Sequence, residues 1–86
     1  MAQYTNVFEV YTQNQKVGCK GQNLNAITFI NNGLVNVTLN NAISLVPGNS
    51  FGISGNENET DETDGYNITF AAGAGASCVV VKKIML

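Results

Sequence analysis

Apolar and polar positions alternate in short runs along the chain. In "YNITF", Tyr66, Ile68 and Phe70 alternate with polar residues, and "NAITFI" and "LVNVTL" repeat the pattern. A period of two is typical of strands with one buried face, and Gly, Asn and Pro separate the runs at intervals of about ten residues. No segment has a helical period. We therefore expect one all-β domain over residues 1–86, a small antiparallel β-sandwich or partly open barrel of about seven short strands.

The residues between the runs predict how the strands connect. Asn32-Gly33 suits a type I′ hairpin, in which both central residues have positive φ. Asn40-Asn41 is a second turn, and Pro47-Gly48 fits the centre of a type II turn. Together they predict a meander of antiparallel strands. The continuous apolar run 78–81 predicts a strand that is buried on both faces or covered by a neighbouring chain.

Composition indicates a folded domain with a thin core. The chain has 86 residues, of which 44% are hydrophobic and 12% charged, which excludes a disordered chain. A domain of this size buries only about 60% of its unfolded surface. Thirteen asparagines supply much of the polarity. Amide-rich faces suit turns and contacts with other subunits, because a charge is costly to desolvate.

The charged residues exclude several classes of function. The net charge is −2, with four lysines and neither arginine nor histidine. A nucleic-acid binder needs a basic surface, and a serine or cysteine nucleophile needs a base. No apolar run approaches the about 18 residues of a membrane span, and the N-terminus lacks signal-peptide features. We expect no enzyme, no cofactor, no nucleic-acid partner and no membrane span.

Two cysteines, Cys19 and Cys78, lie far apart in the sequence. Without a secretion signal we expect two free thiols. The sequence leaves open a disulfide that closes the long loop between them. The small-residue segment "AAGAGAS" (71–77) predicts a flexible loop or hairpin tip, since no Lys-Ser/Thr pair follows its glycines as a phosphate loop requires.

The run "NENETDETDG" holds five of the six acidic residues. Its side chains Glu57, Glu59, Asp61 and Asp64 are hard oxygen donors of the kind that calcium prefers. The spacing differs from the EF-hand pattern, because Gly65 follows Asp64 directly. The alternatives are a solvated loop, which we favour, and a contact with a neighbouring subunit. In each case the run joins its two flanking strands into a hairpin-like unit.

Five further residues are candidates for contacts with a partner. Crowded carboxylates repel one another, so lysines are expected beside them if the last strand ends there. Two tyrosines lie near the N-terminus, on opposite faces of the first strand, whereas the alternation of the other aromatics favours core packing. The candidates are Tyr4, Tyr11, Glu62, Lys82 and Lys83.

Residues 26–84 resemble small virion proteins of tailed phages, of the crAss-like and other Bacteroidetes type. The shared pattern is "LxPGxSFxIxGNxxExDxTxYxITF" followed by a Val/Ile-Lys-Lys strand, and the inserted-looking "DETDGY" departs from it. The matching residues are Leu45, Pro47, Gly48, Ser50, Phe51, Ile53, Gly55, Asn56, Glu59, Asp61, Thr63, Tyr66, Ile68, Thr69, Phe70, Lys82 and Lys83.

The resemblance implies a non-enzymatic structural protein located in the virion. Its partners would be other virion proteins, in a homo-oligomer or a symmetric multi-copy assembly. A capsid decoration or cementing protein that bridges neighbouring subunits is the leading expectation. A tail, collar or portal-associated ring component is the alternative within this class. An alternative of another class is a carbohydrate- or receptor-binding β module, which requires an exposed aromatic patch.

Overall fold

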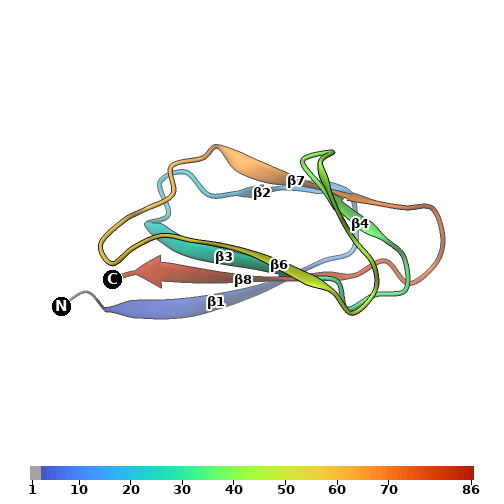
Figure 1. The fold of residues 1–86 in the computed structure, drawn as a ribbon, viewed down its shortest axis with the longest axis horizontal. Helices are drawn as coiled ribbons and strands as arrows, with labels where there is room; N and C mark the ends of the chain where they lie inside the picture. Colours follow the sequence, from blue (N-terminus) through green and yellow to red (C-terminus); the bar gives the residue numbers. More distant parts are fainter. Residues whose placement is uncertain (1–2) are drawn as a thin grey trace.

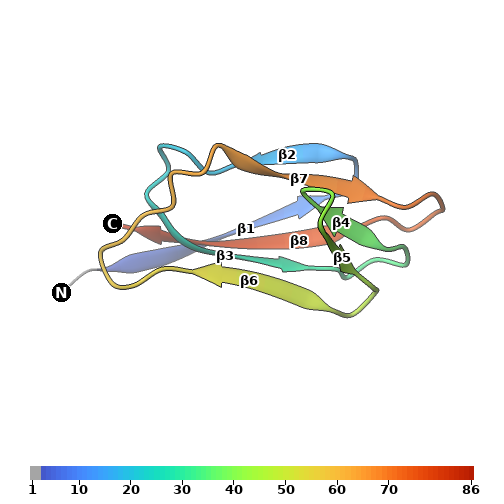
Figure 2. The same ribbon diagram turned by 45° about the horizontal axis from the view of Figure 1, so that its top comes forward.

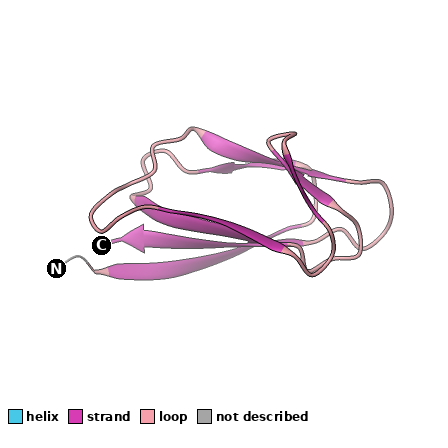
Figure 3. Ribbon diagram, viewed as in Figure 1, coloured by secondary structure: helices cyan, strands magenta, loops and turns pink. Residues whose placement is uncertain are grey.

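The computed structural model describes residues 3–86, which form two four-stranded antiparallel sheets packed face to face (Figures 1 and 3). The all-β prediction is confirmed, and the architecture is a sandwich rather than a closed barrel. The strands are β1 (Tyr4–Tyr11), β2 (Gln15–Gly18), β3 (Leu24–Ile30), β4 (Val37–Leu39), β5 (Ile43–Leu45), β6 (Ser50–Ser54), β7 (Gly65–Phe70) and β8 (Cys78–Met85).

The strand order shows that the chain passes repeatedly between the two sheets (Figure 2). Sheet A has the order β1-β8-β3-β6, and sheet B has the order β2-β7-β4-β5. Among these strands, only β4 and β5 are both consecutive in sequence and paired with each other. The predicted meander is therefore wrong, because most turns carry the chain across the sandwich instead of back along the same sheet.

The predicted turn at Asn40-Asn41 is confirmed, and it joins β4 to β5. Asn40 and Asn41 have φ values of 52° and 55°, and the Ala42 N–H donates to the Leu39 carbonyl at 3.0 Å. Asparagine tolerates the left-handed region better than most residues. Two asparagines in sequence therefore reverse the chain between two short strands.

The hairpin predicted at Asn32-Gly33 is wrong. The strand before it, β3, pairs with β6 and β8, and the strand after it, β4, belongs to sheet B. Neither residue has positive φ. Glycine is required at 33 for a different reason: a Cβ there would lie 2.5 Å from the Gly75 carbonyl oxygen. The segment 71–77 is a loop as predicted, but it joins two sheets and is no hairpin tip.

Pro47-Gly48 forms the predicted turn, with Gly48 at φ 90° and the Asn49 N–H donating to the Val46 carbonyl at 3.0 Å. This turn also connects the sheets, since it leads from β5 to β6. Sequence therefore located the reversal but not the sheet that the next strand joins.

The core lies between the sheets and follows the alternation of the strands. Phe29 of β3 packs edge-on against Tyr66 of β7, with ring centroids 5.5 Å apart. In β8, Cys78 and Val80 are buried, whereas Val79 and Val81 are half-buried. The prediction of burial on both faces of residues 78–81 thus holds for one face. The buried hydrophobic residues are Val17, Cys19, Leu24, Ile27, Phe29, Val37, Leu39, Leu45, Tyr66, Ile68, Cys78 and Val80.

Both cysteines are buried and free, as predicted. Burial is the main cause that raises the pKa of each thiol. The molecule is elongated, 44 × 20 × 16 Å, and the segment between β6 and β7 lies at the same end as the start of β1 and the end of β8 (Figure 1). Within residues 3–86 no helix is long and apolar enough to cross a membrane.

Candidate functional site

The acidic segment (residues 55–64) crosses the end of the sandwich. It leaves β6 in sheet A and enters β7 in sheet B, so the predicted hairpin-like unit is wrong. Strand β6 pairs with β3, and β7 pairs with β2 and β4. The acidic segment therefore closes one end of the molecule.

A β-bulge in β3 holds the acidic segment in place. The register with β8 shifts between Leu24 and Ala26, and the intervening Asn25 is buried. The Asn25 amide donates to the carbonyls of Asn56 and Glu59, at 2.8 and 2.9 Å. The Glu59 carboxylate accepts the Asn56 N–H at 2.7 Å. Several fixed hydrogen bonds thus shape this segment.

Asp61 accepts hydrogen bonds from two residues, one in the acidic segment and one in β7. It accepts the Tyr66 hydroxyl at 2.7 Å and the Thr63 N–H at 2.8 Å. Hydrogen bonding from Thr63, and then from Tyr66, keeps the pKa of Asp61 below its usual value of 3.8. Burial, together with the bond to Asp61, raises the pKa of Tyr66 to about 12. The pair joins the acidic segment to the core.

The other acidic side chains have separate partners. Asp64 forms an exposed ion pair with Lys16, which lowers the pKa of Asp64. Glu62 accepts the Gly21 N–H at 3.2 Å. Glu57 is exposed. The lysine that forms an ion pair with the run is thus Lys16, where the sequence had suggested the two lysines of the last strand.

The geometry does not assemble a metal site from the candidates Glu57, Glu59, Asp61 and Asp64. Within residues 3–86, no three His, Cys, Asp or Glu side chains are grouped closely enough to hold an ion. An open depression of about 510 Å³ lies beside the segment. Its acidic side chains, Glu59 and Asp61, already accept hydrogen bonds from the protein.

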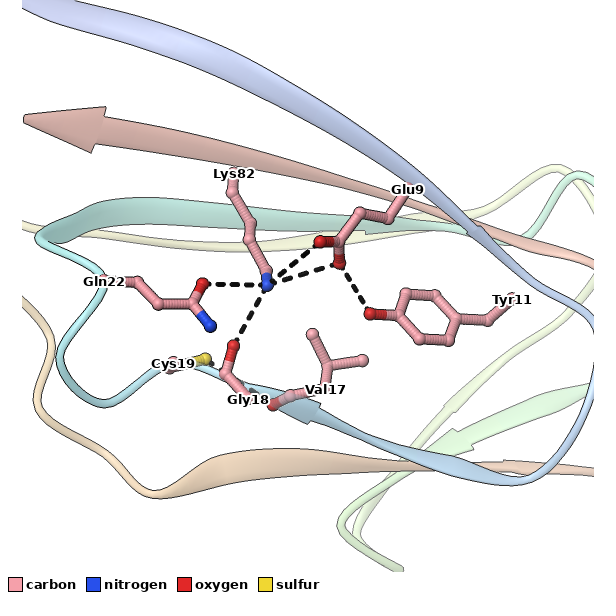
Figure 4. A network of polar contacts seen from close by, with 7 residues as sticks. All are labelled: Glu9, Tyr11, Val17, Gly18, Cys19, Gln22 and Lys82. Carbon is pink, nitrogen blue, oxygen red and sulfur yellow. Dashed lines mark hydrogen bonds and ion pairs between the residues drawn. The ribbon is translucent and has the colours of Figure 1, made fainter.

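Lys82 points into the sandwich (Figure 4) and is only 3% exposed. Its ammonium donates to the Gly18 carbonyl and to Gln22 Oε1, both at 3.0 Å, and lies 3.2 Å from Glu9 Oε1. Glu9 also accepts the Tyr11 hydroxyl at 2.5 Å. Acceptors from Glu9, Gly18 and Gln22 therefore surround the buried ammonium, and the Glu9 carboxylate balances its charge. Lys82, a candidate for partner contact, is a structural residue.

The remaining candidates are Tyr4 and Tyr11, on opposite faces of β1, and Lys83 of the neighbouring strand β8. Tyr11 packs against the core, and burial is the main cause that raises its pKa. Tyr4 faces outward, where the Lys83 ammonium lies 4.4 Å from its ring centroid. The Tyr4 hydroxyl accepts the Asn58 N–H at 3.2 Å. Tyr4 and Lys83 thus link the end of sheet A to the acidic segment.

The outer face of sheet A is apolar around β1. Phe8 and Val10 are 68% and 64% exposed and lie directly opposite the half-buried Val81 and Val79 of β8. A single exposed apolar residue is ordinary, but neighbouring ones mark contact surfaces. We call Phe8, Val10, Val79 and Val81 the apolar outer patch.

The core packing that the sequence favoured for the aromatics other than Tyr4 and Tyr11 is wrong for Phe8, which is exposed. Sequence reasoning therefore did not single out this patch, nor the buried amides of Asn25 and Asn31. In β1 both alternating sets are mixed, so the sequence does not show which set faces the core. The charge of Glu9 is matched inside by Lys82, and this leaves the set with Phe8 and Val10 outside. The sequence signal for the patch is that Phe8 and Val10 stand two positions apart and therefore share one face of the strand.

Comparison with protein-family models, with curated proteins and with solved structures finds no match for this chain.

Proposed function

We propose that the chain is a non-enzymatic structural subunit of a phage virion. In this proposal it is a capsid decoration or cementing protein that bridges neighbouring subunits in a multi-copy assembly. The observation that carries the proposal is the apolar outer patch, with Phe8 68% and Val10 64% exposed on one edge of sheet A. Apolar surface of this kind is stabilised when another protein covers it.

Two further features support an assembly subunit. The resemblance of residues 26–84 to small tailed-phage virion proteins supports the virion as the location. The core is small and the fold elongated, 44 × 20 × 16 Å, so a large share of the chain lies at the surface. Contacts with neighbours would add the burial that the isolated domain lacks.

The patch favours protein contact over sugar binding. A carbohydrate site combines an aromatic face with polar groups that bond to hydroxyls. Phe8 has Val81 opposite it and Val10 next to it on the same face. The polar neighbours on this face, Asn6 and Lys83, lie on the other side of Phe8, and the Lys83 ammonium is held over the ring of Tyr4. The apolar neighbours exclude water, which favours contact with another protein.

Quantitative mass spectrometry of particles purified from the source that encodes the chain tests the proposal. We expect the chain at tens to hundreds of copies per particle, in a fixed ratio to the major capsid protein. A ratio of a few copies supports a tail, collar or portal ring instead. Absence from intact particles, or specific binding to a glycan array by the isolated protein, contradicts the proposal.

A further inference from the structure

We propose that β1 is the docking site for a second copy of this chain. Two β1 strands pair antiparallel about a two-fold axis at Phe8 and join two A sheets into one eight-stranded sheet. The inference rests on the proposed function and deepens it, since it names the surface through which copies of the subunit meet.

Strand β1 differs from the other edges of the sandwich. In residues 3–86 the edge strands are β1 and β6 of sheet A and β2 and β5 of sheet B. The strands β6, β2 and β5 have five, four and three residues, whereas β1 has eight. Proteins protect their edges with short strands, lysines, prolines, bulges or inward-pointing charges. The sequence of β1, YTNVFEVY, contains no lysine or proline, and its register with β8 is unbroken. Its one inward-pointing charge, Glu9, is paired with Lys82 of the same chain.

One side of β1 is fully paired, and the pairing continues past its end. Its eight residues match eight residues of β8, and the Leu86 N–H donates to the Gln3 carbonyl at 2.8 Å. The opposite side of the strand is the margin of the sheet (Figure 1). Its backbone groups are a ready template for another strand.

The pleat restricts the register of two β1 strands. Residues directly opposite in an antiparallel pair lie on the same face. A two-fold axis between two β1 strands therefore places one residue directly opposite its own copy. An axis at Glu9 brings two carboxylates together. An axis at Val7 places Phe8 opposite Asn6 twice. An axis at Phe8 places the two phenyl rings together on the outer face, and Val7 opposite Glu9 on the inner face.

The axis at Phe8 is favoured because it covers the most exposed apolar side chain of the strand. Val81 lies beside Phe8 on β8, so an apolar band crosses the axis from Val81 to Val81 of the second copy. Aromatic and β-branched neighbours across strands stabilise a sheet.

Charge does not oppose this approach. The only ionisable acid in β1, Glu9, is paired with Lys82 of the same chain. The ammonium of Lys83, on the outer face, lies over the ring of Tyr4. Two copies can therefore approach along β1 without bringing unpaired like charges together.

One strand pair buries less than the roughly 800 Å² per partner that stable interfaces use. The dimer is therefore reversible in solution, and it is strengthened wherever many copies are held close together.

Cysteine cross-linking tests the register. Directly opposed residues have Cα atoms about 4.5–5.5 Å apart, within reach of a disulfide, and the native cysteines are buried. We expect Phe8→Cys to form a disulfide-linked dimer under mild oxidation. The matched control is Val10→Cys, whose two copies lie about 13 Å apart in this register. Equal cross-linking of both variants, or of neither, overturns the inference.

A charge exchange gives a second test. Phe8→Lys and Phe8→Glu should each be monomeric, because like charges would meet at the axis, and their mixture should form a heterodimer. The control is Leu34→Lys, at a residue that is 79% exposed and lies outside β1, which should dimerise like the unmodified chain. A mixture that stays monomeric, or a Phe8→Lys variant that dimerises normally, overturns the inference.

These results separate the two proposals. If the chain is abundant in particles but Phe8→Cys does not cross-link, the β1 interface is wrong and the structural function stands. If Phe8→Cys cross-links but particles lack the chain, the virion function is wrong and the interface stands.

Discussion

Lys82 illustrates how one residue can serve the fold while resembling a surface residue in the sequence. Its neighbour Lys83 is exposed, and the two form a typical basic pair at the end of a strand. Alternation turns one of them inward, where Glu9, Gly18 and Gln22 surround its ammonium. A buried charge is tolerated only when such partners compensate its lost hydration.

We predict that Lys82→Met destabilises the domain by about 2–3 kcal/mol, because it leaves Glu9 and the Gly18 carbonyl without their donor. This predicted loss of stability is small for a buried ion pair because Glu9 keeps some exposure to water. Urea unfolding measures the change. The matched control, Lys83→Met, should cost less than about 1 kcal/mol, since it removes an exposed contact with Tyr4. Equal losses in both variants would show that the buried network contributes nothing.

Asp61 gives the stability a dependence on pH. Its pKa in the folded protein lies below 3.8, mainly because Thr63 and Tyr66 donate to it. The unfolded chain therefore takes up a proton at a higher pH than the folded chain, and stability falls as the pH drops from 3.8 through the folded pKa. Above pH 3.8 the contribution is fully present.

We predict that Asp61→Asn lowers the melting temperature at pH 7 and makes the loss below pH 4 shallower than in the unmodified protein. Thermal melts at several pH values measure both effects. The control, Glu62→Gln, changes an exposed acid whose partner is the Gly21 N–H. Glu62→Gln should lose melting temperature below pH 4 as steeply as the unmodified protein does. If Asp61→Asn also loses it as steeply, Asp61 does not have this role.

At the scale of elements, the connections between sheets depend on asparagine side chains. Asn31 follows β3 of sheet A and is 0% exposed. Its amide donates to the carbonyls of Val35 and Leu45, at 2.8 and 2.9 Å, and Leu45 belongs to β5 of sheet B. The Asn31 oxygen accepts the Gly33 N–H at 3.1 Å. One side chain thus ties two sheets together where the chain crosses between them.

We predict that Asn31→Ala destabilises the domain by about 2–4 kcal/mol, because it leaves buried carbonyls without donors. Urea unfolding is the measurement, and Asn36→Ala, at an exposed site in the same segment, is the control with a change below about 0.5 kcal/mol. If Asn31→Ala is no more costly than the control, the link between the sheets is not made by this amide.

The elements themselves were predictable because their signals are local. The period of two predicted where the strands lie, and the Asn40-Asn41 pair predicted the turn between β4 and β5. Their partners were not predictable, since Asn32-Gly33 has the composition of a hairpin turn yet lies at a crossing between sheets. A turn signal reports that the chain reverses, and only packing over the whole chain decides which sheet the next strand joins.

The candidate sites show the same limit. The acidic run was correctly located as a loop between strands, but its hydrogen bonds to Asn25 depend on a bulge that the sequence does not reveal. Lys82 and Glu9 are 73 residues apart, so their pairing depends on the register of β1 with β8. The inward direction of Glu9 in turn exposes Phe8 and Val10.

At the scale of the whole molecule, these features divide the surface into three parts. The acidic segment closes one end through its bonds to β3 and β7, and crossing loops held by Asn31 form the other end. Between them, the β1 edge combines unpaired backbone with the apolar outer patch. An assembly built through β1 leaves both ends of the molecule available to other subunits.

Sedimentation velocity of the unmodified protein, from about 1 μM to about 1 mM, tests the central claim that the chain assembles through β1. We predict a monomer that converts reversibly to a dimer as concentration rises, and a Phe8→Lys variant that remains a monomer over the whole range. An unmodified protein that is monomeric at the highest concentration, or a dimer unaffected by Phe8→Lys, would contradict the account.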